Sequence, residues 1–215
     1  SPEAERYVVG QLQELIELLE TKTGQTLDMN ELQAAIQREN ESKEYYKAFL
    51  KEQKHRYYPN TMTLDLYMLF ASHLNIGTQE TLDFFKCLAE DVKTYPEFEG
   101  KGILWVHLMP YYQETLQQYM NYQEKYYIQA CDLNLDYMKP LDAAHPLEAL
   151  AKKMILNIYN GPYERKVEMI RHLVKEFQSD AVIHFCHWGC KQSSGGAMIL
   201  KERMQEIHMP FLILR

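Results

Sequence analysis

The sequence is poor in cysteine, in long apolar runs and in clustered positive charge, and each shortage removes a class of protein. Four cysteines in 215 residues do not form a dense disulfide framework, and a chain of this length needs none to build a core. No apolar run approaches the roughly 20 residues that span a bilayer, and the chain does not open with a cationic segment followed by an apolar one. We therefore expect reduced thiols in a cytoplasmic protein with no membrane segment.

Positive charge is scattered rather than grouped. The formal net charge is −7, with 23 Lys and Arg residues set against 30 Asp and Glu residues. Without a basic stripe the chain has nothing to neutralise a row of phosphates, so we expect no nucleic-acid partner. The remaining composition, 46% hydrophobic and 25% charged, is typical of a folded globular protein.

The first hundred residues carry helical periodicity. An apolar stripe with three- and four-residue steps predicts a helix from Pro2 to about Thr23. A capping-box pattern at Asp28 opens a second helix that runs to about Lys54. This second helix is dense in Glu, Gln and Lys, so we expect it to be largely solvated and to lie across the rest of the protein. Two shorter helices are predicted next, over 63–73 and 78–94.

Beyond residue 100 short apolar strands alternate with helices. Such alternation predicts an α/β fold with a four-stranded parallel, Rossmann-like sheet that is flanked by helices and preceded by a helical layer. The strands are expected over 103–107, 126–131, 181–185 and 211–214. The helices among them are expected over about 112–122, 147–159, 163–178 and 194–207, and a polar loop over 132–145.

The change of pattern near residue 100 suggests two parts. We interpret residues 1–100 as the helical layer and 101–215 as the Rossmann-like domain. The last predicted strand stops at the end of the chain, where a functional loop normally follows a parallel strand. The sequence is therefore interpreted as a fragment of a longer polypeptide, with the α/β domain truncated at its C-terminal edge.

Cys190 is the residue best placed for chemistry. It follows the strand predicted at 181–185, and ligands of parallel sheets bind at the carboxyl ends of the strands. Gly189 and Lys191 flank it, and the N–H groups at the start of the following helix would favour a thiolate. From the residues alone this thiol could be a nucleophile, a metal ligand, a cluster ligand or an exposed group without a role.

Two narrower interpretations of the same segment are weaker. A zinc site built from His184, Cys186, His187 and Cys190 would normally combine two separated ligand pairs, and no second pair is visible. Core packing explains His184 and Cys186 at least as well. A nucleophilic pair of Cys190 with His187 has no obvious third group to orient the base.

Other residues near this sheet edge have both a functional and a structural explanation. The run Ser193-Ser194-Gly195-Gly196 could cradle a phosphate at a helix start, but a tight turn with an N-cap explains it equally well. Trp105 and His107, at the exit of the first strand, could line a pocket or could simply pack in the core.

An ordered series of short motifs resembles the 2-hydroxyacyl-CoA dehydratase family, which includes the 2-hydroxyglutaryl-CoA dehydratase D-component and the benzoyl-CoA reductase subunits. The resemblance covers essentially the whole chain. Trp188-Gly189 and the residues after Lys191 are more similar to the branch carried on very large proteins related to the dehydratase activator. The motifs are Pro146-Leu147-Glu148-Ala149-Leu150-Ala151, Gly161, Glu164-Arg165, Asp180-Ala181-Val182-Ile183 and Gly189-Cys190-Lys191.

The resemblance implies a radical lyase or reductase. Family members bind an oxygen-sensitive [4Fe–4S] cluster through cysteines from two Rossmann-like halves. A separate ATP-dependent activator supplies one electron, and the cluster passes it to a CoA thioester. An identical or paralogous subunit is a further implied partner. By this resemblance Cys190 is a cluster ligand, and the residues implied around it or in the pocket are Lys191, Ser193, Ser194, His187, Trp105 and His107.

The chain also departs from the family pattern. The other cluster cysteines lie in an amino-terminal Rossmann-like half, and this sequence begins after it, while Arg215 stands where an acidic continuation is expected. One cysteine cannot hold a four-iron cluster, so we expect this fragment to bind none and to be inactive alone. The alternative hypothesis is a non-catalytic interaction or regulatory domain that keeps the fold and docks a partner through its helical layer.

Overall fold

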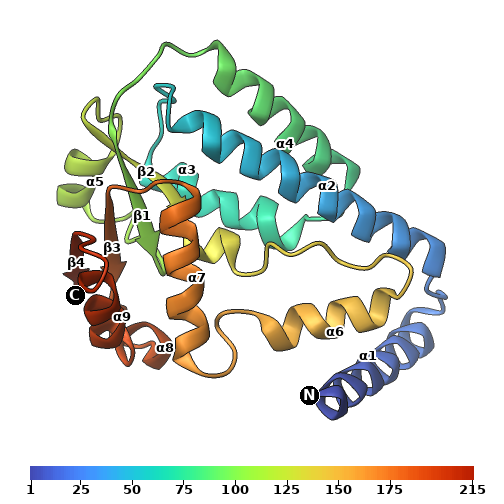
Figure 1. Ribbon diagram of the computed structural model, residues 1–215. Helices are drawn as coiled ribbons and strands as arrows, with labels where there is room; N and C mark the ends of the chain where they lie inside the picture. Colours follow the sequence, from blue (N-terminus) through green and yellow to red (C-terminus); the bar gives the residue numbers. More distant parts are fainter.

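The computed structural model describes residues 1–215 and contains nine α-helices around one four-stranded sheet (Figure 1). The strands are β1 Lys101–Val106, β2 Tyr126–Cys131, β3 Ala181–Phe185 and β4 Phe211–Leu214. The helices are α1 Pro2–Thr23, α2 Met29–Gln53, α3 Met62–Leu69, α4 Gln79–Asp91, α5 Glu114–Met120, α6 Pro146–Leu156, α7 Tyr163–Glu176, α8 Lys191–Ser194 and α9 Ala197–Gln205. A π-helical turn, Phe70–Leu74, continues α3, and 3-10 turns cover Val92–Thr94 and Asp132–Leu135.

The sheet is entirely parallel, with the strand order β2-β1-β3-β4. This confirms the predicted α/β fold with a four-stranded parallel sheet. The chain passes from β1 to β2 on one side and then crosses back to β3 on the other side of β1. The carboxyl ends of β1 and β3 therefore form a topological switch point, the place where open parallel sheets bind their ligands.

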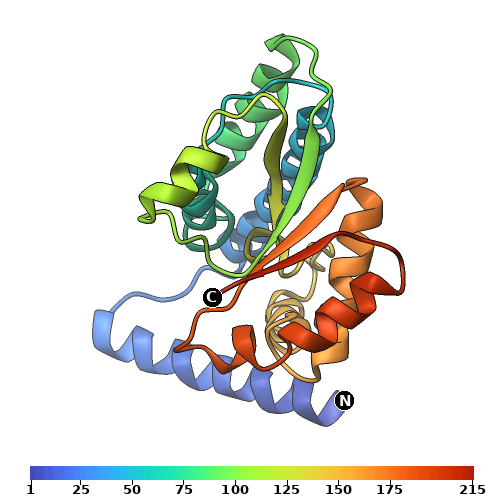
Figure 2. The ribbon, with the colours of Figure 1, turned by 90° about the vertical axis from the view of Figure 1, so that its left-hand side faces the viewer.

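Helices cover both faces of the sheet, as Figure 2 shows. Successive strand residues point to opposite faces, and two separate core clusters result. Leu104, Val106 and Val182 pack with apolar residues of α2, α4, α7 and α9. Ile103 and Trp105 pack on the other side with residues of α3 and α5. Strands that are buried on both faces explain the nearly continuous apolar runs in the sequence.

Helix α2 is much more buried than its composition predicts. Eight of its residues are buried, Glu39 and Lys43 among them, and α4 packs along it (Figure 1). Glu39 Oε1 lies 2.6 Å from Lys43 Nζ and 2.7 Å from Lys153 Nζ of α6. The expectation of a largely solvated helix is wrong because these charges are paired with one another, and pairing allows charged side chains to be buried.

Helix α1 packs beside α6 and away from the sheet (Figure 1). None of its residues is buried, and an ion pair of 3.3 Å joins Glu5 to Lys152 of α6. Four of its apolar side chains, those of Tyr7, Leu15, Leu18 and Leu19, are about half exposed or more. None of the helices combines the length and the apolar composition that crossing a membrane would need.

Candidate functional site

The loops that leave β1 and β3 lie next to each other at the switch point. Val106 is the residue of β1 that pairs with His184 of β3. The first loop starts at His107, and the second contains the segment from Cys186 to Cys190. The structure therefore brings the sequence-predicted site residues of both loops to one edge of the sheet, as the strand–helix pattern indicates.

Cys190 is half-buried and lies in a tight turn. Its N–H donates to the carbonyl of His187 at 2.9 Å, and its own carbonyl accepts from the N–H of Ser194 at 3.0 Å. The helix predicted over about 194–207 corresponds to α9. A separate helical turn of four residues, α8, directly follows Cys190. A longer helix start behind the sulfur, which the sequence suggests, is not formed.

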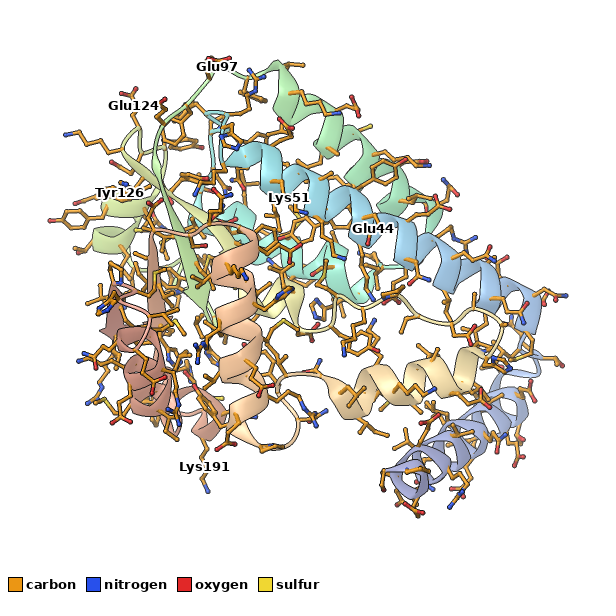
Figure 3. The ribbon with its side chains drawn as sticks, viewed as in Figure 1. Glu44, Lys51, Glu97, Glu124, Tyr126 and Lys191 are labelled. Carbon is orange, nitrogen blue, oxygen red and sulfur yellow. The ribbon has the colours of Figure 1, made fainter.

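The serines after Cys190 hold the turn in place. Ser193 is fully buried; its Oγ donates to the carbonyl of Phe185 at 2.7 Å and accepts from the N–H of His187 at 3.1 Å. Ser194 is exposed, and its Oγ donates to the carbonyl of Cys190 at 3.0 Å. Lys191 is exposed and points away from the sheet (Figure 3). The Ser193 hydroxyl thus has main-chain partners on both sides of the turn.

Gly196 allows α7 to approach the start of α9. A Cβ atom at this position would overlap the ring of Tyr163. Packing therefore supplies a reason for this glycine that does not require a phosphate.

We expect Gly196→Ala to lower the free energy of unfolding by about 1–3 kcal/mol, because the Tyr163 ring would have to move within a packed core. Urea unfolding measures the change. Gly10→Ala is the matched control, since nothing lies within 4 Å of a Cβ there and α1 should gain up to about 1 kcal/mol from alanine. Equal effects of the two substitutions would contradict the close approach at Gly196.

The two residues predicted at the exit of β1 are both buried. Trp105 is completely buried, and its Nε1 donates to the carbonyl of Leu108 at 3.1 Å, so it packs in the core. His107 adopts a left-handed backbone conformation with φ of 77°, which is strained for a residue other than glycine. Burial and the nearby Lys166 ammonium lower the pKa of His107 to about 4, so its imidazole is neutral at pH 7.

A buried charged pair that the sequence did not reveal lies beneath this edge. Asp132 follows β2 directly, Lys166 belongs to α7, and both side chains are fully buried with Nζ 3.1 Å from Oδ2. Tyr159 Oη donates to the same Oδ2 at 2.8 Å. Lys166 occupies a position on the apolar stripe of α7, between Tyr163 and Ile170. A lysine at such a position is the sequence signal that could have indicated a buried charge.

His184 is also completely buried, in the middle of β3. Neither of its ring nitrogens has a hydrogen-bond partner within the chain. Burial and the charge of Lys166 lower its pKa to about 4, so it is neutral at pH 7. His184 therefore packs in the core, but its imidazole is not satisfied there.

The thiols differ sharply in accessibility. Cys131 and Cys186 are buried, and burial raises the pKa of each thiol. Cys87 is exposed on α4, a helix that packs against α2. No group of three or more His, Cys, Asp or Glu side chains is arranged to hold a metal ion. At the switch point the chain thus offers one accessible thiol, Cys190, which suits one ligand position of a metal cluster and no more.

Comparison with known protein families gives a match over the whole chain. The protein-family model described as 2-hydroxyglutaryl-CoA dehydratase, D-component, matches residues 1–215. No curated protein matches the chain.

Proposed function

Because this chain belongs to the 2-hydroxyglutaryl-CoA dehydratase D-component family, we propose that it acts in a [4Fe–4S]-dependent dehydratase-type protein whose substrate is a CoA thioester. The observation that carries the proposal is the position of Cys190. This residue is the accessible thiol beyond β3, at the switch point where parallel sheets bind ligands. Cysteine thiolates are the usual ligands of iron–sulfur clusters.

In this proposal Cys190 holds one iron, and the remaining ligands come from cysteines outside the 215 residues. The cluster, when bound, supplies single-electron chemistry, and an ATP-dependent activator is the proposed electron donor. An identical or paralogous subunit is a further proposed partner. His187, Lys191 and Ser194 lie within four residues of Cys190 along the chain, and we assign them to the surroundings of the sulfur.

Several residues at the carboxyl ends of β1 and β3, and in the turn after β3, are buried. Ser193 fixes the turn on β3, and the imidazoles of His107 and His184 are buried and neutral at pH 7. Hydrogen bonds from surrounding groups and exclusion of water are the means by which a protein tunes a cluster. Trp105 packs in the core on the α3 and α5 side of the sheet, opposite the side that α7 and α9 cover.

The test is metal analysis of the natural protein purified without oxygen. We expect iron and acid-labile sulfide in the wild-type protein, and Cys190→Ser should remove the cluster or change its electron paramagnetic resonance spectrum. Cys87→Ser is the matched control because that thiol is exposed on α4, and it should leave iron content and spectrum unchanged. An unchanged cluster in the Cys190→Ser protein would show that another residue is the ligand.

A second candidate function is a non-catalytic interaction domain that docks a partner through residues 1–100. Exposed aromatic side chains in this part favour it. The rings of Tyr67 and Phe70 stack with centroids 5.5 Å apart, and both residues are about half exposed. Absence of iron and sulfide from protein purified without oxygen would favour this candidate over the first.

A further inference from the structure

The buried Asp132–Lys166 pair needs a physical explanation. Both side chains are fully buried, and taking two charges out of water costs several kcal/mol for each ion before their attraction is counted. An apolar pair of similar volume often gives equal or greater stability. The contacts of the pair therefore indicate its role better than its energy does.

Asp132 connects four segments of the chain. Its Oδ1 accepts from the main-chain N–H of His107 at 2.6 Å, at the left-handed residue that ends β1. Its Oδ2 accepts from Tyr159 Oη at 2.8 Å, in the connection between α6 and α7. Lys166 of α7 completes the set at 3.1 Å. One carboxylate thus holds the ends of β1 and β2, the α6–α7 connection and α7 in a fixed arrangement.

Tyr159 is fixed on two sides by this pair. Its hydroxyl is bound to Asp132, and Lys166 Nζ lies 4.1 Å from the centre of its ring. A cation at that distance is attracted to the face of an aromatic ring. Because both the hydroxyl and the face of the ring are bound, the side chain of Tyr159 is fixed and restrains the main chain that carries it.

The main chain of Tyr159 is in turn bound to the Cys190 turn. Gln192 Nε2 donates to the carbonyl of Tyr159 at 2.6 Å, and Gln192 lies two residues after Cys190 in α8. Ser193 anchors the same turn to β3 through the carbonyl of Phe185. The turn is therefore bound to β3 through Ser193 and to the connection between α6 and α7 through Gln192.

We propose that Asp132, Lys166 and Tyr159 are positioning residues that set the location and accessibility of the Cys190 sulfur, acting through Gln192. The chemical relevance of this positioning rests on the proposed role of Cys190 as a cluster ligand. The positioning itself is a property of the metal-free chain, so it can be tested separately from that role.

The test measures how fast Cys190 reacts with 5,5′-dithiobis(2-nitrobenzoate) at fixed pH in the 215-residue chain, with Cys87→Ser as background. We expect both Gln192→Ala and Tyr159→Phe to accelerate the reaction of Cys190 at least about threefold, because each frees the turn to open locally. The double variant should react no faster than Gln192→Ala alone, since both substitutions break the same link. Gln205→Ala, an exposed glutamine of α9, is the matched control and should react like the background protein.

The buried thiols distinguish positioning from general loosening. Mass spectrometry of the labelled protein should show Cys131 and Cys186 still protected in both variants. A Cys190 rate within twofold of the background would overturn the proposal, and so would parallel acceleration of all three thiols. Gln192→Ala alters no buried charge, so the test remains decisive if Tyr159→Phe fails to fold. Absence of iron from the natural protein would contradict the proposed cluster. It would not contradict the positioning role, which the labelling rates test separately.

Discussion

Lys166→Met should lower the free energy of unfolding by about 3–5 kcal/mol, because it leaves the Asp132 carboxylate buried without a counter-ion. Asp132 and Lys166 are both completely buried, 3.1 Å apart, so water cannot replace the lost ammonium. Urea unfolding at pH 7 measures the effect. Lys175→Met in the same helix is the matched control, since Lys175 is exposed, and it should change stability by less than about 0.5 kcal/mol.

The double variant Lys166→Met/Asp132→Asn should recover most of this loss. It leaves no charge unpaired. The amide oxygen at position 132 can still accept from the N–H of His107, and the amide NH2 group can donate to Tyr159 Oη. A double variant as unstable as Lys166→Met would mean that packing of the lysine stem, and not the unpaired carboxylate, causes the loss. A single variant no less stable than the Lys175→Met control would contradict the buried ion pair itself.

Asp65→Asn should raise the free energy of unfolding by about 2–4 kcal/mol at pH 8 and by less than about 1 kcal/mol at pH 4. One oxygen of Asp65, Oδ2, is sealed from solvent and has no partner, while Oδ1 accepts from Asn60 Nδ2 at 2.8 Å. Burial raises the pKa of Asp65 to about 7, against about 3.9 in an unfolded chain. The amide at this position keeps an acceptor for Asn60 and has no charge to bury.

The sign of the pH dependence follows from proton binding. Between about pH 4 and pH 7 the native state holds a proton on Asp65 that the unfolded state has lost, so this group destabilises the fold increasingly as pH rises. The difference between wild type and Asp65→Asn should therefore grow from pH 4 to pH 8. Asp83→Asn is the matched control, because Asp83 is an exposed aspartate of α4, and its effect should not vary in this way. A pH-independent benefit of Asp65→Asn would exclude a raised pKa.

The elements of the sheet follow from local sequence patterns, and for that reason they could be predicted. Each strand is a short apolar run, and the burial of β1 on both faces matches its sequence, Lys101 to Val106. Cys190 could be placed at the carboxyl edge of the sheet because it follows a predicted strand directly, in a turn that contains Gly189. These features depend on neighbours in sequence.

The buried charges could not be predicted because their partners are distant in sequence. Glu39 of α2 meets Lys153 of α6, and Asp132 meets Lys166 across a helix and two loops. Composition alone makes α2 look solvated and makes the start of the 132–145 segment look like a polar loop. The first expectation fails. The loop over 132–145 is present after a short 3-10 turn, but its first residue, Asp132, is buried. In both cases the charge is paired with a residue distant in sequence, and hydrophobic periodicity does not record such pairing.

The central position of β1 has a consequence for how this protein can change. The chain leaves β1 toward one side and returns on the other, so the neighbouring positions of the loops after β1 and β3 are set by the path of the backbone and by no individual side chain. New residues can therefore be tried in these loops while strand register and core stay as they are. Stability then depends on the sheet and its core, while chemistry depends on the loops. Such a fold can be adapted to different reactions.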